Sequence, residues 1–354
     1  MKPPDFELEE WFDEYETNVE INLSKGYIQG LGTSRFNTSI DKLEYAAPTA
    51  GDIELREELG SRYDRSPEEI LCTCGAQEAN LIAALSILEP GDHTIVVLPT
   101  YKSITNIPSV LGDTTTIELN PPDWEVPLER IVASITPTTK LIVMDNPNNP
   151  TGKYHEQETI ESIYEIAASE DIFLLIDEGY RAIVSEPYDP IAAFGNYGVS
   201  IASVTKPYGL AGLRFGWMAA NSHIIERATM WKNHTTISPP ILSQQIAHQA
   251  LTDQEDDILS THRSLLDQNA NRIKEFVNRH ELQWHPSETS TAFVKIPDSY
   301  ASGREFSIEL VEKQDTLVVP GESFGHNQYI RIGFGISPEI LEQGLGRINT
   351  LLNS

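Results

Sequence analysis

A lysine between an apolar run and a glycine-rich run is the residue best placed to do chemistry in this 354-residue chain. Lys206 lies in the segment SIASVTKPYGLAGLRFGW, positions 200–217. A lysine amine becomes a useful nucleophile when its surroundings depress its pKa. Ser203 and Arg214 can both hold a phosphate, the arginine as a charged fork. An imine-forming lysine beside a phosphate clamp suits a cofactor that carries a carbonyl group and a phosphate. The alternative is a surface lysine after a buried strand.

Two strand ends supply polar groups that suit the same kind of cofactor. In MDNPNNPTG, positions 144–152, Asn149 can donate to an oxygen on a cofactor ring while proline and glycine fix the turn. In IDEGY, positions 176–180, Asp177 can keep a pyridine nitrogen protonated, which makes the ring an electron sink. Tyr180 can reach a hydroxyl of that ring. The alternatives are an ordinary Asn/Pro loop and a strand-end carboxylate that caps the next helix.

A third stretch offers a binding site for the phosphate. The pattern of LCTCGAQEAN, positions 71–80, indicates a strand-like segment followed by Gly75 and a helix. Backbone amides at a helix start bind phosphate well, so Gly75, Ala76 and Gln77 would line that site. The alternative is a plain strand-to-helix turn.

Alternating strand and helix patterns from about Pro67 to Ala220 indicate the sheet that positions these groups. The expected helices include 77–88 and 157–169. The expected strands are 93–99, 114–120, 140–147, 172–178, 199–205 and 215–220. Several of them are apolar throughout, as strands buried on both faces should be. The alternation predicts an α/β fold with a mostly parallel sheet flanked by helices, and function at the strand ends.

The pattern changes after residue 240. Long helices are expected over 241–280, then strands in TAFVKIPD, DTLVVPG and QYIRIGFG, and a closing helix from Pro338. This order predicts a smaller α+β C-terminal domain. We expect a large domain over 41–240, the small domain over 241–354, and an N-terminal segment, 1–40, that packs with the small domain.

The formal net charge of -28 limits the classes of partner. Binding of nucleic acid or of an anionic membrane needs clustered Lys and Arg, so neither is expected. The acidic residues are spread along the chain, which indicates a solvated acidic surface. Such a surface serves solubility or adaptation to high salt, and the low lysine content favours high salt.

Location and metal content follow from further patterns. No window reaches the ~20 apolar residues that span a bilayer, and the acidic N-terminus lacks the features of a signal peptide. We expect a cytoplasmic protein. Cys72 and Cys74 are too close for a disulfide framework, and the nine histidines show no metal-ligand spacing, so no metal site is expected.

Taken together, these motifs resemble fold-type-I pyridoxal-phosphate enzymes of the class I/II aminotransferase family. KPYGLAGLRFGW is the most specific segment, and NPNNPTG and DEGY match in order and spacing. The resemblance runs from about Asn22 to the C-terminus. It implies the fold-type-I architecture and pyridoxal 5'-phosphate as cofactor.

The resemblance also implies roles for individual residues. Lys206 would carry the internal aldimine and shuttle the proton between substrate carbon and cofactor. Asp177 would pair with the pyridinium nitrogen. The remaining cofactor contacts would come from Tyr180 and Asn149 at the ring oxygen, from Ser203, Arg214 and the turn Gly75, Ala76, Gln77 at the phosphate, and from the stacked ring of Tyr101.

Further implied roles concern the substrate and a second subunit. Arg331, in YIRIGFG, matches the arginine that grips the substrate α-carboxylate through a bidentate pair, with Asn149 beside it. The alternative is a strand arginine on an exposed face. Tyr45 matches a tyrosine that reaches the phosphate of the partner subunit, which implies a homodimer with active sites at the interface.

Some residues depart from the family pattern. Thr205 stands where serine is frequent, Pro207 follows the lysine, and Cys74 stands where a hydroxyl residue is common. None of these removes a reacting group. NLSKGYIQG, positions 22–30, differs from the usual loop over the substrate, which suggests a substrate other than aspartate or an aromatic amino acid. Arg35 is a candidate to meet a second carboxylate.

The resemblance favours an aminotransferase that moves an amino group between an amino acid and a 2-oxo acid by a ping-pong mechanism. The runner-up is a lyase, decarboxylase or cyclodehydratase of the capreomycidine synthase type with the same cofactor. A third reading is a non-catalytic effector-sensing module, as in some transcription regulators, but a DNA-binding domain is not evident before Tyr45. A dinucleotide-binding dehydrogenase fails for lack of GxGxxG after the first strand.

Overall fold

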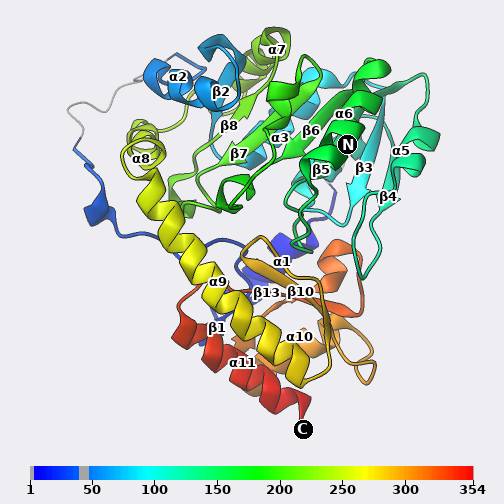
Figure 1. Ribbon diagram of the computed structural model, residues 1–354, viewed down its shortest axis with the longest axis vertical. Helices are drawn as coiled ribbons and strands as arrows, with labels where there is room; N and C mark the ends of the chain where they lie inside the picture. Colours follow the sequence, from blue (N-terminus) through cyan, green and yellow to red (C-terminus); the bar gives the residue numbers. More distant parts are fainter. Residues whose placement is uncertain (1–3, 40–47, 354) are drawn as a thin grey trace.

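The computed structural model describes residues 4–39 and 48–353, and its main element is a seven-stranded sheet (Figure 1). Neighbouring strands are parallel except β8, which runs antiparallel to both of its neighbours. The predicted α/β fold with a mostly parallel sheet is therefore confirmed. In spatial order the strands are β2 (Ile70–Thr73), β8 (Gly216–Ala219), β7 (Gly198–Ser203), β6 (Phe173–Asp177), β5 (Thr139–Asp145), β3 (His93–Leu98) and β4 (Asp113–Glu118).

Both faces of this sheet are buried, which explains the unbroken apolar runs in its central strands. Ile142 of β5 packs on one face with α6 (Gln157–Ser169). Its neighbour Leu141 packs on the other face with α3 (Ala76–Ile87) and α7 (Ser222–Lys232). Alternate residues of a strand point to opposite faces, so a strand covered on both sides needs apolar residues at consecutive positions.

The expected helices of this region form close to their predicted bounds. The segments predicted over 77–88 and 157–169 correspond to α3 and α6. Helix α3 follows β2 with only a short turn between them, which brings its first residues to the edge where the strands end. The other helices of this part are α2 (Ile53–Arg62), α4 (Ser103–Leu111) and α5 (Leu128–Ser134).

A smaller part of the molecule lies below the large sheet in Figure 1. Its four-stranded sheet is antiparallel, with the strands in the order β12 (Val319–Pro320), β13 (Tyr329–Gly333), β10 (Thr291–Lys295) and β9 (Gln283–Trp284). The predicted smaller α+β region is confirmed. The helices after residue 240 are α8 (Ile241–Leu251), α9 (Glu255–Arg279), α10 (Gly303–Gln314) and α11 (Pro338–Leu352).

The segment DTLVVPG, expected as one strand, forms two short strands in different sheets. β11 (Thr316–Leu317) pairs with β1 (Ile21–Asn22), whereas β12 pairs with β13. Between the two short strands, the carbonyl of Val318 accepts a hydrogen bond from the indole of Trp11 at 2.9 Å. Contacts with the N-terminal segment thus divide this strand, which the local sequence does not reveal.

The N-terminal segment and the C-terminal region contact each other directly. Helix α1 (Glu7–Tyr15) supplies Trp11, and β1 extends the contact with β11. Helix α8, by contrast, lies near α2, because the amide of Asp52 donates to the Gln244 side chain at 2.8 Å. The division into segments 1–40, 41–240 and 241–354 stays a prediction.

Candidate active site

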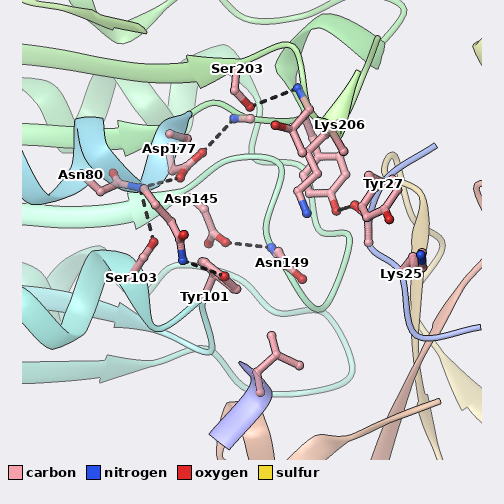
Figure 2. A pocket seen from close by; sticks show the side chains of 18 of the residues that line it. Lys25, Tyr27, Asn80, Tyr101, Ser103, Asp145, Asn149, Asp177, Ser203 and Lys206 are labelled. Atoms are coloured by element: carbon pink, nitrogen blue, oxygen red, sulfur yellow. Dashed lines mark hydrogen bonds between the residues drawn. The ribbon is translucent and has the colours of Figure 1, made fainter. Parts of the chain in front are cut away.

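A cavity of about 420 Å³ opens at the carboxyl ends of β5, β6 and β7. Figure 2 shows Asp145 and Asp177 on one side, Lys25 and Tyr27 on the other, and Lys206 between them. The structure brings most of the predicted site residues to this wall: Ala76, Gln77, Tyr101, Asn149, Asp177, Tyr180, Ser203, Lys206, Arg214 and Arg331. Gly75 lies directly behind Arg214. Tyr45 lies outside the described residues.

The Lys206 amine lies in a confined space. Its Nζ is 5.5 Å from the centroid of the Tyr180 ring. A Cβ added to Gly26 would lie only 3.4 Å from that nitrogen, so the loop backbone passes close by. Desolvation and then the positive charge of Arg331 lower the pKa of Lys206 to about 8, against the opposing effect of Asp177. Near neutral pH an appreciable fraction of this amine is therefore neutral and nucleophilic.

The Asp177 carboxylate is held at the end of β6. It accepts hydrogen bonds from the Asn80 side chain and from the backbone amide of Gly179, both at 3.0 Å. Burial raises the pKa of Asp177, and these two donors and Lys206 oppose that rise. Among the residues that the structure describes, none is a hydrogen-bond partner of the Asn80 side-chain oxygen. A buried carboxylate in a cavity wall is suited to a cationic ring N–H.

Asp145 is a second carboxylate in the wall, one that sequence reasoning missed. It ends β5 and accepts from the Asn149 amide at 2.9 Å and from the Asn148 side chain at 2.6 Å. Burial raises the pKa of Asp145 to about 8, and the like charge of Asp177 contributes. Its contacts fix the loop that carries Asn149. The sequence could have revealed Asp145, because it is the aspartate of MDNP at the end of an expected strand.

Arg331 lies in β13 and is 2% exposed. Its guanidinium donates to the Asn149 side-chain oxygen at 3.0 Å and to the Ser24 carbonyl at 2.8 Å. Within residues 4–39 and 48–353 its Nε has no partner. Burial lowers the pKa of Arg331. A buried guanidinium with donors left over fits a carboxylate ligand. The bond to Asn149 leaves the amide nitrogen of that side chain for a second acceptor.

The predicted phosphate site forms a concave group that we call the anion cradle: Gly75, Ala76, Gln77, Ser203 and Arg214. Gly75 has φ +84°, and a Cβ added there would lie 2.5 Å from a guanidinium nitrogen of Arg214. The positive φ favours glycine, and a larger residue would also displace the Arg214 guanidinium. Helix α3 begins at Ala76, so its first amides lack partners within the helix and face an arginine.

Behind the anion cradle lies a buried ion pair that the sequence did not reveal. The Glu78 carboxylate accepts from the Cys74 amide at 2.6 Å, from Thr236 at 2.7 Å and from the Lys232 amine at 2.9 Å. The Lys232 side chain is fully buried. Burial would raise the pKa of Glu78, but these donors outweigh it and lower that pKa. The network ties the turn before Gly75 to the end of α7.

Two predicted tyrosines make contacts with N-terminal residues. The Tyr180 hydroxyl donates to the Gly26 carbonyl. The Tyr101 hydroxyl donates to Glu9 at 2.5 Å and accepts from Gln77 at 3.0 Å. The unusual loop NLSKGYIQG does lie in the cavity wall, through residues 25–27.

Other expectations concern residues away from this cavity. Arg35 pairs with Asp257 and Gln254 and does not line the cavity. Over residues 4–39 and 48–353, no group of three or more His, Cys, Asp or Glu side chains is arranged to hold a metal ion. Within the same ranges, every helix is too short or too polar to cross a bilayer.

The residues present fit pyridoxal phosphate. Asp177 offers a buried carboxylate, the anion cradle offers amides and an arginine, and Lys206 offers an amine with a lowered pKa. Unpaired polar atoms remain on Asn80 and Arg331 in the same cavity wall. These groups match an aromatic nitrogen, a phosphate and a carbonyl carbon.

Known proteins resemble this chain over nearly its full length. The sequence model of the family described as "Aminotransferase class I and II" matches residues 35–348. A probable aspartate aminotransferase of Methanocaldococcus jannaschii is 28% identical, with 91% of this chain and 92% of that protein covered. An aspartate/prephenate aminotransferase of Thermus thermophilus is 28% identical, with 88% and 84% covered. The solved structure of a PLP-dependent aminotransferase from Streptococcus suis has a TM-score of 0.93 at 30% identity, with 100% and 98% covered.

Replacement of Lys232 tests the buried network behind the anion cradle. Lys232→Met leaves the Glu78 carboxylate buried without its cation, so unfolding free energy should fall by about 3–5 kcal/mol in denaturant titration. Arg272→Met is the matched control, since Arg272 pairs with the exposed Glu342, and it should cost less than about 1 kcal/mol. Equal losses in the two variants would contradict the structural role of the pair.

The lowered pKa of Lys206 predicts a distinct pH dependence of its labelling. In protein stripped of bound small molecules, reductive labelling by a small aldehyde requires the neutral amine. The Lys206 labelling rate should rise with pH and be half-maximal near pH 8. Lys313 serves as control in the same sample, because the Glu309 carboxylate raises its pKa and delays its labelling to clearly higher pH. Peptide mapping by mass spectrometry measures both, and coincident profiles would refute the shift.

Proposed function

The chain belongs to the class I and II aminotransferase family, and from that premise we propose what each side chain of the cavity does. It is a pyridoxal-phosphate-dependent aminotransferase that moves an amino group between an amino acid and a 2-oxo acid. The observation that carries the residue assignment is the Lys206 amine in one cavity with Asp177, Arg331 and the anion cradle. When bound, pyridoxal phosphate supplies the carbonyl that receives the amino group and a ring that withdraws electrons.

The cavity residues would bind that group in three regions. Asp177 is the partner of the ring nitrogen, since it is a buried carboxylate already held by Asn80. The anion cradle binds the phosphate. Tyr180 and Asn149 bind the ring oxygen, and Tyr101 lies against the ring. Support for the Asn149 role is its amide nitrogen, which remains free because the oxygen accepts from Arg331.

Lys206 and Arg331 would act on the amino acid. Arg331 binds the α-carboxylate through its guanidinium, and this contact orients the substrate toward Lys206. The neutral Lys206 amine takes the proton from the α-carbon and returns a proton at the other end of the transfer. A pKa near 8 suits both tasks, because the group gains and loses a proton at little cost near neutral pH.

Transamination is favoured over elimination, decarboxylation and cyclisation. The two curated relatives named above are described as aminotransferases, and the family description is the same. The same lysine and cofactor groups would serve those alternatives, so the choice between them depends on how the substrate side chain is held.

We also propose a homodimer with the active sites near the interface. Support comes from large apolar side chains exposed in one region: Met230 at 64%, Trp231 at 40%, Ile237 at 45% and Ile53 at 44%. A hydrogen bond of 3.0 Å between Thr49 and Asn233 joins the two chain segments of this region. Exposed apolar patches of this kind mark association surfaces. The cytoplasmic location and the adaptation to high salt stay predictions.

Replacement of the lysine tests the catalytic assignment. Lys206→Ala should reduce 2-oxo acid formation by on the order of 10³-fold or more, because both proton transfer and covalent attachment are lost. Borohydride reduction of the wild-type holoenzyme should fix the cofactor to the peptide that contains Lys206. Lys313→Ala, at an exposed lysine, is the control and should retain wild-type turnover. A Lys206→Ala protein with near wild-type rates would end the assignment.

The proposed dimer can be tested by sedimentation. Wild-type protein should sediment as two copies at micromolar concentration, and the double variant Met230→Glu and Trp231→Glu should shift toward one copy. Charges introduced into an apolar interface lose their hydration without gaining partners. The exposed Ile340→Glu, on α11, controls for surface charge and should leave the dimer intact. A wild-type monomer would overturn the proposal.

A further inference from the structure

Helix α1 directs one carboxylate into the active-site cavity. Leu8, Glu9 and Phe12 line the cavity from one face of this helix, and Glu16, which lines it too, directly follows the helix. One oxygen of Glu9 accepts from the Tyr101 hydroxyl at 2.5 Å. Among the described residues, the other oxygen of Glu9 has neither a hydrogen bond nor an ion pair. The carboxylate thus retains an acceptor for a ligand in the same cavity as Lys206.

The positive groups of the cavity have other partners. Lys206, Arg331 and Arg214 belong to the cofactor and α-carboxylate positions proposed above. Lys25 pairs with Glu16 at 3.0 Å, so these two charges cancel at the cavity edge. Arg35 lies outside the cavity. In the part of the chain that the structure describes, the charge left over beneath α1 is therefore the negative charge of Glu9.

The position of Glu9 suits contact with the substrate side chain. Its charge acts on both Lys206 and Arg331, which would hold the two ends of the amino acid backbone. With those ends held, the side chain must extend into the remaining space. That space is bounded by Glu9, the Phe12 ring and Tyr27. An apolar stem with a cationic end matches this combination of ring and carboxylate.

We propose that Glu9 binds a cationic group, an ammonium or guanidinium, at the end of the substrate side chain. The amino donor is then a basic amino acid. A second carboxylate, as in aspartate, would meet Glu9 with like charge and find no unpaired cation among the described residues. This inference rests on the proposed aminotransferase function and adds its substrate class.

The test compares donors that differ only in the terminal charge. With purified holoenzyme, kcat/KM is measured for L-lysine and L-arginine, for L-norleucine, which is lysine without its ammonium group, and for L-aspartate. The wild type should prefer lysine or arginine to norleucine by roughly 10- to 100-fold, the worth of a charged hydrogen bond. Aspartate should be the poorest donor.

The variant Glu9→Gln should bring the basic-to-norleucine ratio close to one. The glutamine oxygen still accepts from Tyr101, so the tyrosine position is retained. Glu10→Gln is the matched control, because Glu10 is the next residue of α1 and is exposed. It should keep the wild-type ratio. Spectral titration of the holoenzyme with each amino acid gives dissociation constants that should change in the same direction.

The outcomes separate the two proposals. If none of the amino acids yields a 2-oxo acid or alters the cofactor spectrum, the proposed function fails. If transamination occurs but norleucine or aspartate equals the basic donors, the inference about Glu9 is overturned while the function stands. A basic preference that survives Glu9→Gln also overturns it, since another group would then select the cation.

Discussion

Removal of charged groups from bulk water at the strand ends is the constraint on which this structure depends. Lys206, Asp177 and Arg331 each lose hydration, and an unpaired charge in such a place is costly. Asp177 and Arg331 are compensated by groups from distant parts of the chain. Arg331 donates to Asn149, 182 residues away, and to Ser24, 307 residues away. The cavity is therefore stable only when the N-terminal segment, the large sheet and the small sheet are assembled together.

The same reasoning extends beyond the cavity wall. Gly75 and the Arg214 guanidinium approach so closely that a side chain at Gly75 would displace the guanidinium. Such a close approach needs a rigid backbone, and the Glu78 carboxylate supplies it by accepting from the Cys74 amide while it pairs with Lys232. A buried ion pair contributes less to stability than to the fixed position of the groups that it joins. The carboxylates of this region are thus held by paired donors, while Asn80 and Arg331 each keep one polar atom without a partner among the described residues.

Local signals explain how much could be predicted from the sequence. Strand periodicity and turn residues located the large sheet, and the motifs located Lys206, Asp177 and Arg214, because each motif is short and lies at a strand end. Glu9 gave no signal, since it stands in ELEEWFDEY among other acidic residues and only the fold distinguishes it. Asn80 and Lys232 act through partners remote in sequence, which local patterns do not contain. The divided strand in DTLVVPG has the same origin, because its partner β1 is almost 300 residues earlier.

The contact between the two ends of the chain has a consequence for biosynthesis. Helix α1 is fixed by the Val318 carbonyl, and β1 is paired with β11. On the ribosome the first residues emerge long before these partners exist, so Trp11 lacks its acceptor and β1 lacks its paired strand until residues 316–318 have been made. The large sheet can form earlier, but the cavity acquires Arg331 only after β13 has been made. A truncated nascent chain therefore holds a lysine without the surroundings that make it reactive.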